Sequence, residues 1–155
     1  MGMPISWTQR VIQTRASAAV IVIRFLAGGV FFIEGVKKFL LADQWGAGRF
    51  ARIGIPMPVI SGPFVGGIEI VCGLLLLAGL LTRLGAAVLL VNISVAIAAT
   101  KLPILLKGGF LAMEDPARTD YSMFMSLLFL LIVGAGPWSL DNALLSRRRG
   151  EAGEC

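Results

Sequence analysis

Four long apolar runs divide the sequence, and stretches rich in polar residues, glycine and proline separate them. The runs cover residues 17–41, 64–81, 84–100 and 121–135. A helix of about 20 predominantly apolar residues crosses a hydrocarbon core about 30 Å thick. The pattern therefore predicts an all-α protein, a membrane-embedded antiparallel four-helix bundle.

The connections between the runs predict how the helices follow one another. Thr82 and Arg83 form so short a connection that the second and third spans must lie side by side and antiparallel. Residues 42–63 and 101–120 are predicted to be long loops outside the membrane, because their prolines break helices. The first loop has room for a short interfacial turn around Trp45, and the second is apolar enough to act as a lid. The prolines of the first loop are Pro56, Pro58 and Pro63.

The composition indicates one integral membrane domain. Hydrophobic residues make up 57% of the 155 residues, charged residues make up 15%, and the mean hydropathy is +0.85. The domain is predicted to cover residues 17–141, between an N-terminal segment of residues 1–16 and a basic tail of residues 142–155. Arg24 and Glu34 interrupt the first apolar run, so we predict that it is mature structure rather than a signal peptide.

The net charge of +5 comes mostly from basic residues at the ends of the apolar runs rather than from one basic patch. This placement is typical of membrane orientation and argues against a nucleic-acid partner. Because the number of predicted spans is even, both termini lie on one side, and the basic residues of the two ends favour the cytoplasm. The sequence has no histidine, no CxxC motif and only two cysteines, Cys72 and Cys155. We therefore expect neither a metal site nor a thiol relay.

Charged residues inside the apolar runs are the candidates for chemistry, because a charge in the membrane needs a partner or a function. At about 1.5 Å per helical residue, Glu34 and Glu69 both lie about 8–10 Å from the outer membrane surface. Lys37 and Lys38 follow Glu34 at i+3 and i+4, the spacings at which a carboxylate and an ammonium meet on one helix face. Lys101 and Tyr121 begin or end spans near the same level. The predicted ligand-binding candidates are Glu34, Lys38, Glu69, Lys101 and Tyr121.

Two interpretations of this cluster remain open from the sequence. It is either an ion-pair network of Glu34, Lys38 and Glu69 that fixes the helix register, or a site where one carboxylate exchanges a proton while a lysine polarises a bound carbonyl. Gly66 and Gly73 flank Glu69 on one helix face, which predicts that Glu69 lies in a helix interface.

Arg24 lies about 15 Å below Glu34 on the same helix, and its predicted neighbour by depth is Asn92. Arg24 and Asn92 would then form a second, structural polar layer. The alternative is that Arg24 extends along the helix to the inner lipid headgroups.

Several segments together resemble the DoxX family. They are RFLAGGVFFIEGVKKF (residues 24–39), GIPMP (54–58), EIVCGLLLLAGLLTRLGA (69–86), DY (120–121) and GAGPWSLD (134–141). The order and spacing of these segments carry the resemblance, which covers all but the ends of the chain. Arg24, Glu34, Lys38 and Glu69 match positions of the family pattern, for which the family has no agreed catalytic role.

The resemblance implies a small four-helix protein of the bacterial inner membrane. Relatives in the family include the membrane subunit of a thiosulfate:quinone oxidoreductase and a membrane partner in a mycobacterial thiol and superoxide defence complex. Similar folds occur in eukaryotic assembly chaperones for channels. The absence of histidine disfavours a quinone site built on a histidine donor.

Two functions therefore compete. The first is a redox-linked membrane subunit that binds a quinone, or a similar hydrophobic molecule, in the outer polar pocket and receives electrons from a partner. The second is a non-enzymatic scaffold or assembly factor that holds another protein. The expected partners are membrane lipid and either a protein partner or a second copy of the chain. A transporter is a weaker third hypothesis, since no interrupted helices occur in matching halves.

Overall fold

The computed structural model describes residues 18–151, and their side chains as far as Ser146. These residues form helices, with no strand among them, so the predicted all-α class is confirmed. The predicted segment 1–16 and the last residues of the tail lie outside this range. The long helices are α2 (Val20–Leu40), α5 (Pro58–Ala78), α6 (Thr82–Thr100) and α7 (Leu102–Val133); the short ones are α3 (Ala42–Trp45), α4 (Ala47–Arg52) and α8 (Leu140–Glu151).

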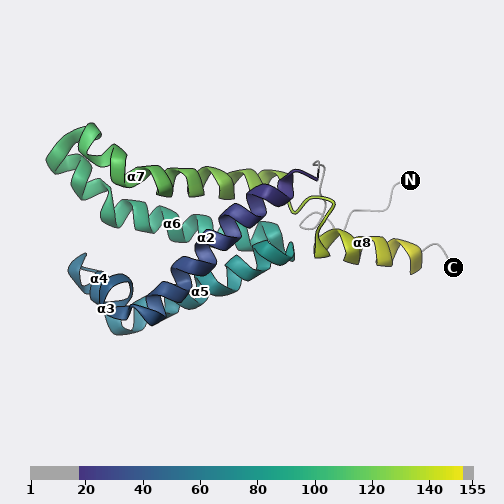
Figure 1. Cartoon of the computed structure of the whole chain (residues 1–155), viewed down its shortest axis with the longest axis horizontal. Helices are drawn as coiled ribbons and strands as arrows, with labels where there is room; N and C mark the ends of the chain where they lie inside the picture. The colour runs from purple at the N-terminus through teal and green to yellow at the C-terminus, as the bar shows by residue number, and fades with distance from the viewer. Residues whose placement is uncertain (1–17, 152–155) are drawn as a thin grey trace, which may run out of the picture.

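The four long helices form two antiparallel pairs. Helix α2 packs along α5, and α6 packs along α7, with fewer contacts between the pairs. Figure 1 shows that the pairs meet near the start of α2 and diverge toward the opposite end, where α3 and α4 lie beside α5. The result is a V with one closed end and one open end.

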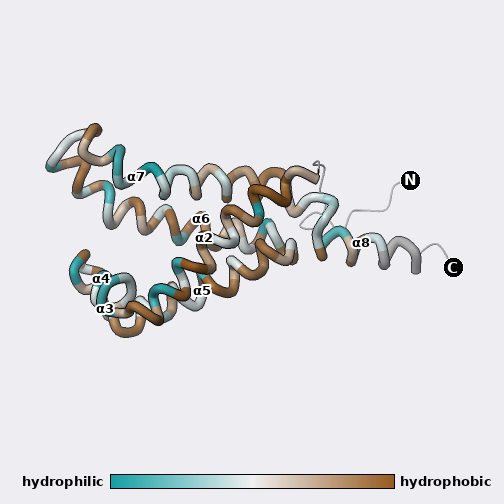
Figure 2. The backbone as a smooth tube through the Cα atoms, viewed as in Figure 1, coloured by the Kyte–Doolittle hydropathy of each residue, from teal (hydrophilic) through white to brown (hydrophobic). Residues whose placement is uncertain are grey.

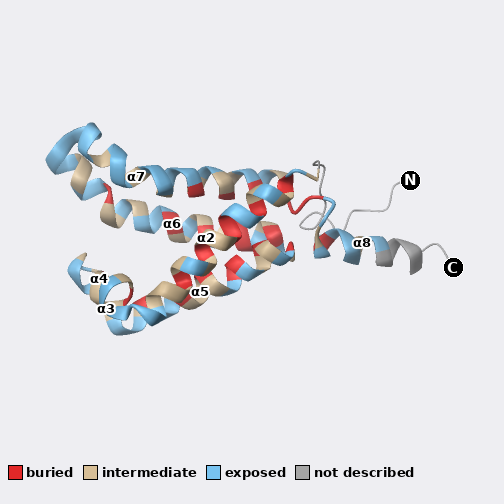
Figure 3. Ribbon diagram, in the orientation of Figure 1, coloured by how far each residue is buried: buried red, intermediate tan, exposed pale blue. Residues whose placement is uncertain are grey.

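Much of the length of the long helices is apolar, and many of their residues are exposed, as the hydropathy in Figure 2 and the burial in Figure 3 show. Large apolar residues point outward from every long helix, among them Phe25, Val71, Val91 and Ile132. So much exposed apolar surface is unusual for a protein in water and is typical of one in lipid. Within residues 18–151, three helices are long and apolar enough to cross a membrane, namely α5, α6 and α7.

Helix α2 is as long as α5 but carries four charged residues, Arg24, Glu34, Lys37 and Lys38. The predicted fourth span rests on this helix. Its crossing of the membrane therefore depends on how those charges are neutralised inside the protein.

The first predicted loop is largely helical. Residues 42–52 form α3 and α4, and α5 begins at Pro58, so that Pro63 lies inside the helix. The prediction that Pro63 breaks the helix is wrong. Pro58 suits the first turn, where no backbone N–H is needed, and Pro63 comes little more than one turn later.

The second predicted loop, residues 101–120, is also helical, and the lid prediction is wrong. Helix α7 starts at Leu102, directly after α6, and continues to Val133. Its chain turns sharply at Gly109, where φ is 77° and ψ is −179°. Glycine adopts this conformation without the steric cost of a Cβ atom. Pro103 lies in the first turn of α7, where it causes no break.

Glycines bring α2 and α5 into close backbone contact. A Cβ atom on Gly35 would lie 2.7 Å from the Gly66 carbonyl oxygen and 2.9 Å from the Ile70 nitrogen. Near the middle of the pair, a Cβ atom on Gly73 would lie 2.9 Å from the Gly28 carbonyl oxygen. The prediction that the Gly66–Gly73 face meets another helix is confirmed. Such contacts hold helices together where lipid removes the hydrophobic driving force.

We predict that Gly35→Ala lowers the stability of the detergent-solubilised protein by roughly 1–3 kcal/mol, because rigid backbone atoms must move to admit the methyl group. Gly29→Ala in the same helix is the control, since nothing lies within 4 Å of a Cβ atom there. Thermal unfolding followed by circular dichroism measures both. Equal unfolding temperatures for the two variants would contradict the close packing of α2 on α5.

Candidate functional site

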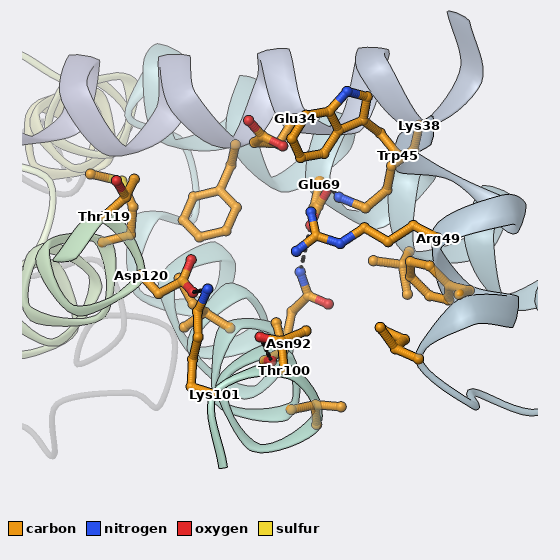
Figure 4. A pocket seen from close by; sticks show the side chains of 18 of the residues that line it. Glu34, Lys38, Trp45, Arg49, Glu69, Asn92, Thr100, Lys101, Thr119 and Asp120 are labelled. Carbon is orange, nitrogen blue, oxygen red and sulfur yellow. Dashed lines mark hydrogen bonds and ion pairs between the residues drawn. The ribbon is translucent and has the colours of Figure 1, made fainter. Parts of the chain in front are cut away.

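A cavity of about 440 Å³ lies at the open end of the V. All four long helices line it, and α3, α4 and the residues that follow close one side. Most of the wall is apolar, with Phe31, Phe50 and Ile93 buried behind it. Polar side chains from different helices converge on the same space, as Figure 4 shows. This combination is typical of a small-molecule site.

Glu69 is the centre of the polar wall. Its carboxylate forms an ion pair with Lys38 of α2 and accepts a hydrogen bond from the Asn92 amide of α6 at 2.8 Å. Only 5% of Glu69 is exposed. One buried carboxylate thus joins three helices, α2, α5 and α6. The cluster satisfies the charge of Lys38, which would otherwise be costly inside an apolar bundle.

Glu34 lines the same cavity but pairs with Lys37, at 2.6 Å, and not with Lys38. The predicted network of Glu34, Lys38 and Glu69 is therefore wrong in its connections, although both glutamates face one cavity. The reason is burial. The side chain of Glu34 is 35% exposed and that of Glu69 only 6%, so the ammonium of Lys38 stabilises Glu69 more.

Lys101 and Asp120 form a second ion pair on the opposite wall, at 3.1 Å, between the end of α6 and helix α7. Tyr121, predicted to join this site, is 62% exposed and does not line the cavity. Because this stretch is helical rather than a loop, neighbouring residues point about 100° apart. Asp120 faces the cavity, and Tyr121 therefore faces outward.

Sequence reasoning missed Arg49 of α4 as a cavity residue and took Trp45 only as an interfacial anchor. The Trp45 ring lies between two cations, 4.7 Å from the Lys37 nitrogen and 5.2 Å from the Arg49 guanidinium carbon. Both Trp45 and Arg49 line the cavity. No helical spacing could have found this pair, because Trp45 ends α3, Arg49 belongs to α4, and Gly46 between them is not helical.

Arg24 lies at the closed end of the V, away from the cavity, and only 2% of it is exposed. Its guanidinium donates hydrogen bonds to four backbone carbonyls, those of Leu76, Leu77, Ala135 and Trp138, at 2.6–2.9 Å. We call this arrangement the arginine clasp. It joins α2 to the end of α5 and to the connection between α7 and α8.

Both predictions for the surroundings of Arg24 are wrong. Asn92 bonds to Glu69 instead, so it belongs to the cavity layer. Arg24 does not extend toward lipid headgroups either, because the backbone carbonyls of the last turn of α5 offer nearer acceptors. Gly79 makes room for the clasp, since a Cβ atom there would lie 2.5 Å from the guanidinium carbon.

Asp141 completes the closed end. It is 1% exposed, and its two carboxylate oxygens accept hydrogen bonds from the backbone N–H groups of Leu81 and Thr82, at 2.8 and 3.1 Å. These are the first N–H groups of α6, which have no partner within the helix. The carboxylate also lies favourably near the positive end of the helix dipole.

The residues that line the cavity suit an organic ligand better than a metal ion. Among residues 18–151, no group of three or more His, Cys, Asp or Glu side chains is placed to ligate a metal ion. Ammonium, guanidinium and amide donors instead surround a partly apolar space, the arrangement expected for an apolar molecule with a few oxygen acceptors.

The fold and the cavity define a small helical membrane protein with a polar site between its helices. The chain belongs to the DoxX family, whose model matches residues 19–102. It is 48% identical over 148 residues to the uncharacterized membrane protein Rv3486 of Mycobacterium tuberculosis, covering 92% of this chain and 90% of that one. It is also 32% identical over 127 residues to an uncharacterized protein of Haemophilus influenzae, covering 81% of this chain and 90% of that one. No solved structure matches the chain.

We predict that Arg24→Lys destabilises the protein by roughly 3 kcal/mol or more, because one ammonium cannot reach four carbonyls that the guanidinium satisfies together. Arg118→Lys, on the exposed surface of α7, is the control and should change stability little. Thermal unfolding in detergent compares the two. A similarly small effect at both positions would show that the clasp is dispensable.

The ion pair of Lys38 and Glu69 predicts a non-additive pair of substitutions. Lys38→Met alone should cost roughly 3–5 kcal/mol, because it leaves a buried carboxylate without its counter-charge. The double variant Lys38→Met with Glu69→Gln should be more stable than Lys38→Met alone, since no charge is then buried. A double-mutant cycle of unfolding free energies gives the coupling, and strictly additive losses would refute it.

Proposed function

We propose that this DoxX protein is a redox-linked membrane subunit that binds a quinone, or a similar hydrophobic small molecule, in the cavity between its two helix pairs. The observation that carries the proposal is the cavity itself. It holds about 440 Å³, is lined mainly by apolar side chains, and receives polar groups from several apolar helices. Pockets of this size and chemistry bind small molecules.

The proposal includes a four-span topology, in which α2 crosses the membrane beside α5. The neutralisation of the α2 charges supports it, because Arg24 is held by carbonyls and each of Glu34, Lys37 and Lys38 is in an ion pair. Four spans put both termini on one side, which we assign to the cytoplasm of a bacterial inner membrane from the basic ends of the chain.

The polar groups fit the oxygens of a quinone. Lys38 and Asn92 on one wall and Lys101 on the other are donors for carbonyl oxygens, and the carboxylates of Glu34 and Glu69 are candidate proton acceptors and donors. Reduction of a quinone takes two electrons and two protons. The proposal assigns the electrons to a partner protein and the proton path to the carboxylates of the cavity.

A scaffold or assembly role is the second candidate, and one observation favours it. Around the sharp turn at Gly109, the apolar residues Leu106, Phe110 and Leu111 are 77%, 66% and 86% exposed. Such residues at one end of the bundle suit contact with a protein partner as well as with lipid. This role would leave the cavity without a ligand.

The test is binding of 2-methyl-1,4-naphthoquinone to the purified protein in non-ionic detergent, measured by isothermal titration calorimetry. Ala96→Phe places a ring in the cavity without touching an ion pair, and we predict that it weakens binding at least roughly 10-fold. Ala98→Phe on the same helix is the control, since Ala98 does not line the cavity.

The double variant Lys38→Met with Glu69→Gln should also weaken binding, because it removes the ammonium that would donate to a carbonyl oxygen of the ligand. If the wild type does not bind the quinone, or if Ala96→Phe and Ala98→Phe bind it equally well, the cavity is excluded as a quinone site. Stable capture of one protein partner by the wild type and by all three variants alike would then favour the scaffold role.

A further inference from the structure

One charged side chain at the cavity has no ion-pair partner among the described residues. Three ion pairs account for six of the charged side chains there, namely Glu34 with Lys37, Lys38 with Glu69, and Lys101 with Asp120. Arg49 is left over. Within the described residues its guanidinium forms no ion pair and no hydrogen bond, and its one recorded interaction is with the Trp45 ring. Arg49 is therefore the cation of the cavity lining that has no carboxylate partner in the described part of the chain, although the lining as a whole carries three positive and three negative side chains.

The guanidinium is held in place for a ligand. It lies 5.2 Å from the centre of the Trp45 ring, and Figure 4 shows the Arg49 side chain reaching from α4 toward the cavity. Contact with an aromatic face uses the flat side of a guanidinium and leaves its N–H groups free to donate hydrogen bonds. Every other cation at the cavity already has a carboxylate partner.

We propose that Arg49 binds the polar head of the cavity's ligand, and that this head is a singly charged pair of oxygens on an apolar body. A carboxylate and the adjacent oxygens of an ionised hydroxyquinone share this chemistry. The inference rests on the proposed function in that the ligand occupies the same cavity. It goes further by naming the charge of the ligand and the residue that selects it.

The physical reason is complementarity between the guanidinium and an anion. A guanidinium presents parallel N–H donors that match a planar oxygen pair, and such charged hydrogen bonds are about twice as strong as neutral ones. Arg49 is partly buried and has no carboxylate partner in the part of the chain that the structure describes, so an anion would supply its missing counter-charge. A neutral ligand of the same shape gains neither advantage. The apolar wall around Phe31 and Ile93 receives the body of either ligand.

The experiment compares two ligands of nearly equal size, 2-hydroxy-1,4-naphthoquinone, which is ionised at neutral pH, and the neutral 2-methyl-1,4-naphthoquinone. Calorimetry in non-ionic detergent should show that the wild type binds the anion roughly 10- to 100-fold more tightly. Arg49→Gln should remove that preference, because it lowers the affinity for the anion far more than the affinity for the neutral ligand.

Two further variants sharpen the result. Arg118→Gln removes a charge from the exposed surface of α7 and should keep the preference. Arg49→Lys keeps the charge but loses the planar fork, so it should retain only part of the preference. A second ligand pair, decanoate and decanol, distinguishes a carboxylate from a hydroxyquinone as the natural head. A fatty-acid site would prefer decanoate to decanol and would bind neither naphthoquinone.

The outcomes separate the two proposals. Equal affinity of the wild type for both naphthoquinones overturns the role of Arg49 but leaves the quinone site standing. If Arg49→Gln lowers the affinity for the anion and for the neutral ligand by the same factor, the role of Arg49 is overturned as well. Preference for decanoate with no naphthoquinone binding supports the role of Arg49 and overturns the quinone. Binding of none of the four ligands overturns both.

Discussion

The arginine clasp is the constraint on which the rest of the structure depends. Arg24 reaches from α2 to the carbonyls that end α5 and to those of the connection after α7, so one side chain closes one end of both helix pairs. Asp141 fixes the start of α6 beside it. With that end closed, the pairs diverge with distance from it, and the space between them becomes the cavity.

The polar cluster at the open end depends on the same geometry. Glycines hold α2 against α5 along their length, which brings Lys38 within reach of Glu69, and Asn92 of α6 meets the same carboxylate. Each buried charge is thereby neutralised within the protein, as a membrane requires. Arg49 departs from this rule, and it does so beside the cavity. An unsatisfied group that persists at a cavity is a reason to look for a ligand there.

Much of the fold could be predicted from the sequence, because apolar runs of membrane length and the glycines around Glu69 are local signals. The level shared by Glu34 and Glu69 followed from the rise of a helix alone. Proline misled the prediction: Pro103 lies in the first turn of α7, where it costs little, whereas α5 and α7 continue through Pro63 and Pro116. Reading residues 101–120 as a loop then placed Tyr121 in the site.

The partners of the charged residues were harder to predict. Lys38 had acceptors on its own helix and on α5, and only the burial of Glu69 decides between them. Backbone carbonyls leave no mark in the sequence, so the partners of Arg24 were out of reach. Gly79 is an indirect sign of this arrangement, because any side chain there would occupy the place of the Arg24 guanidinium. We therefore expect that relatives with an arginine at the position of Arg24 also have a glycine at the position of Gly79.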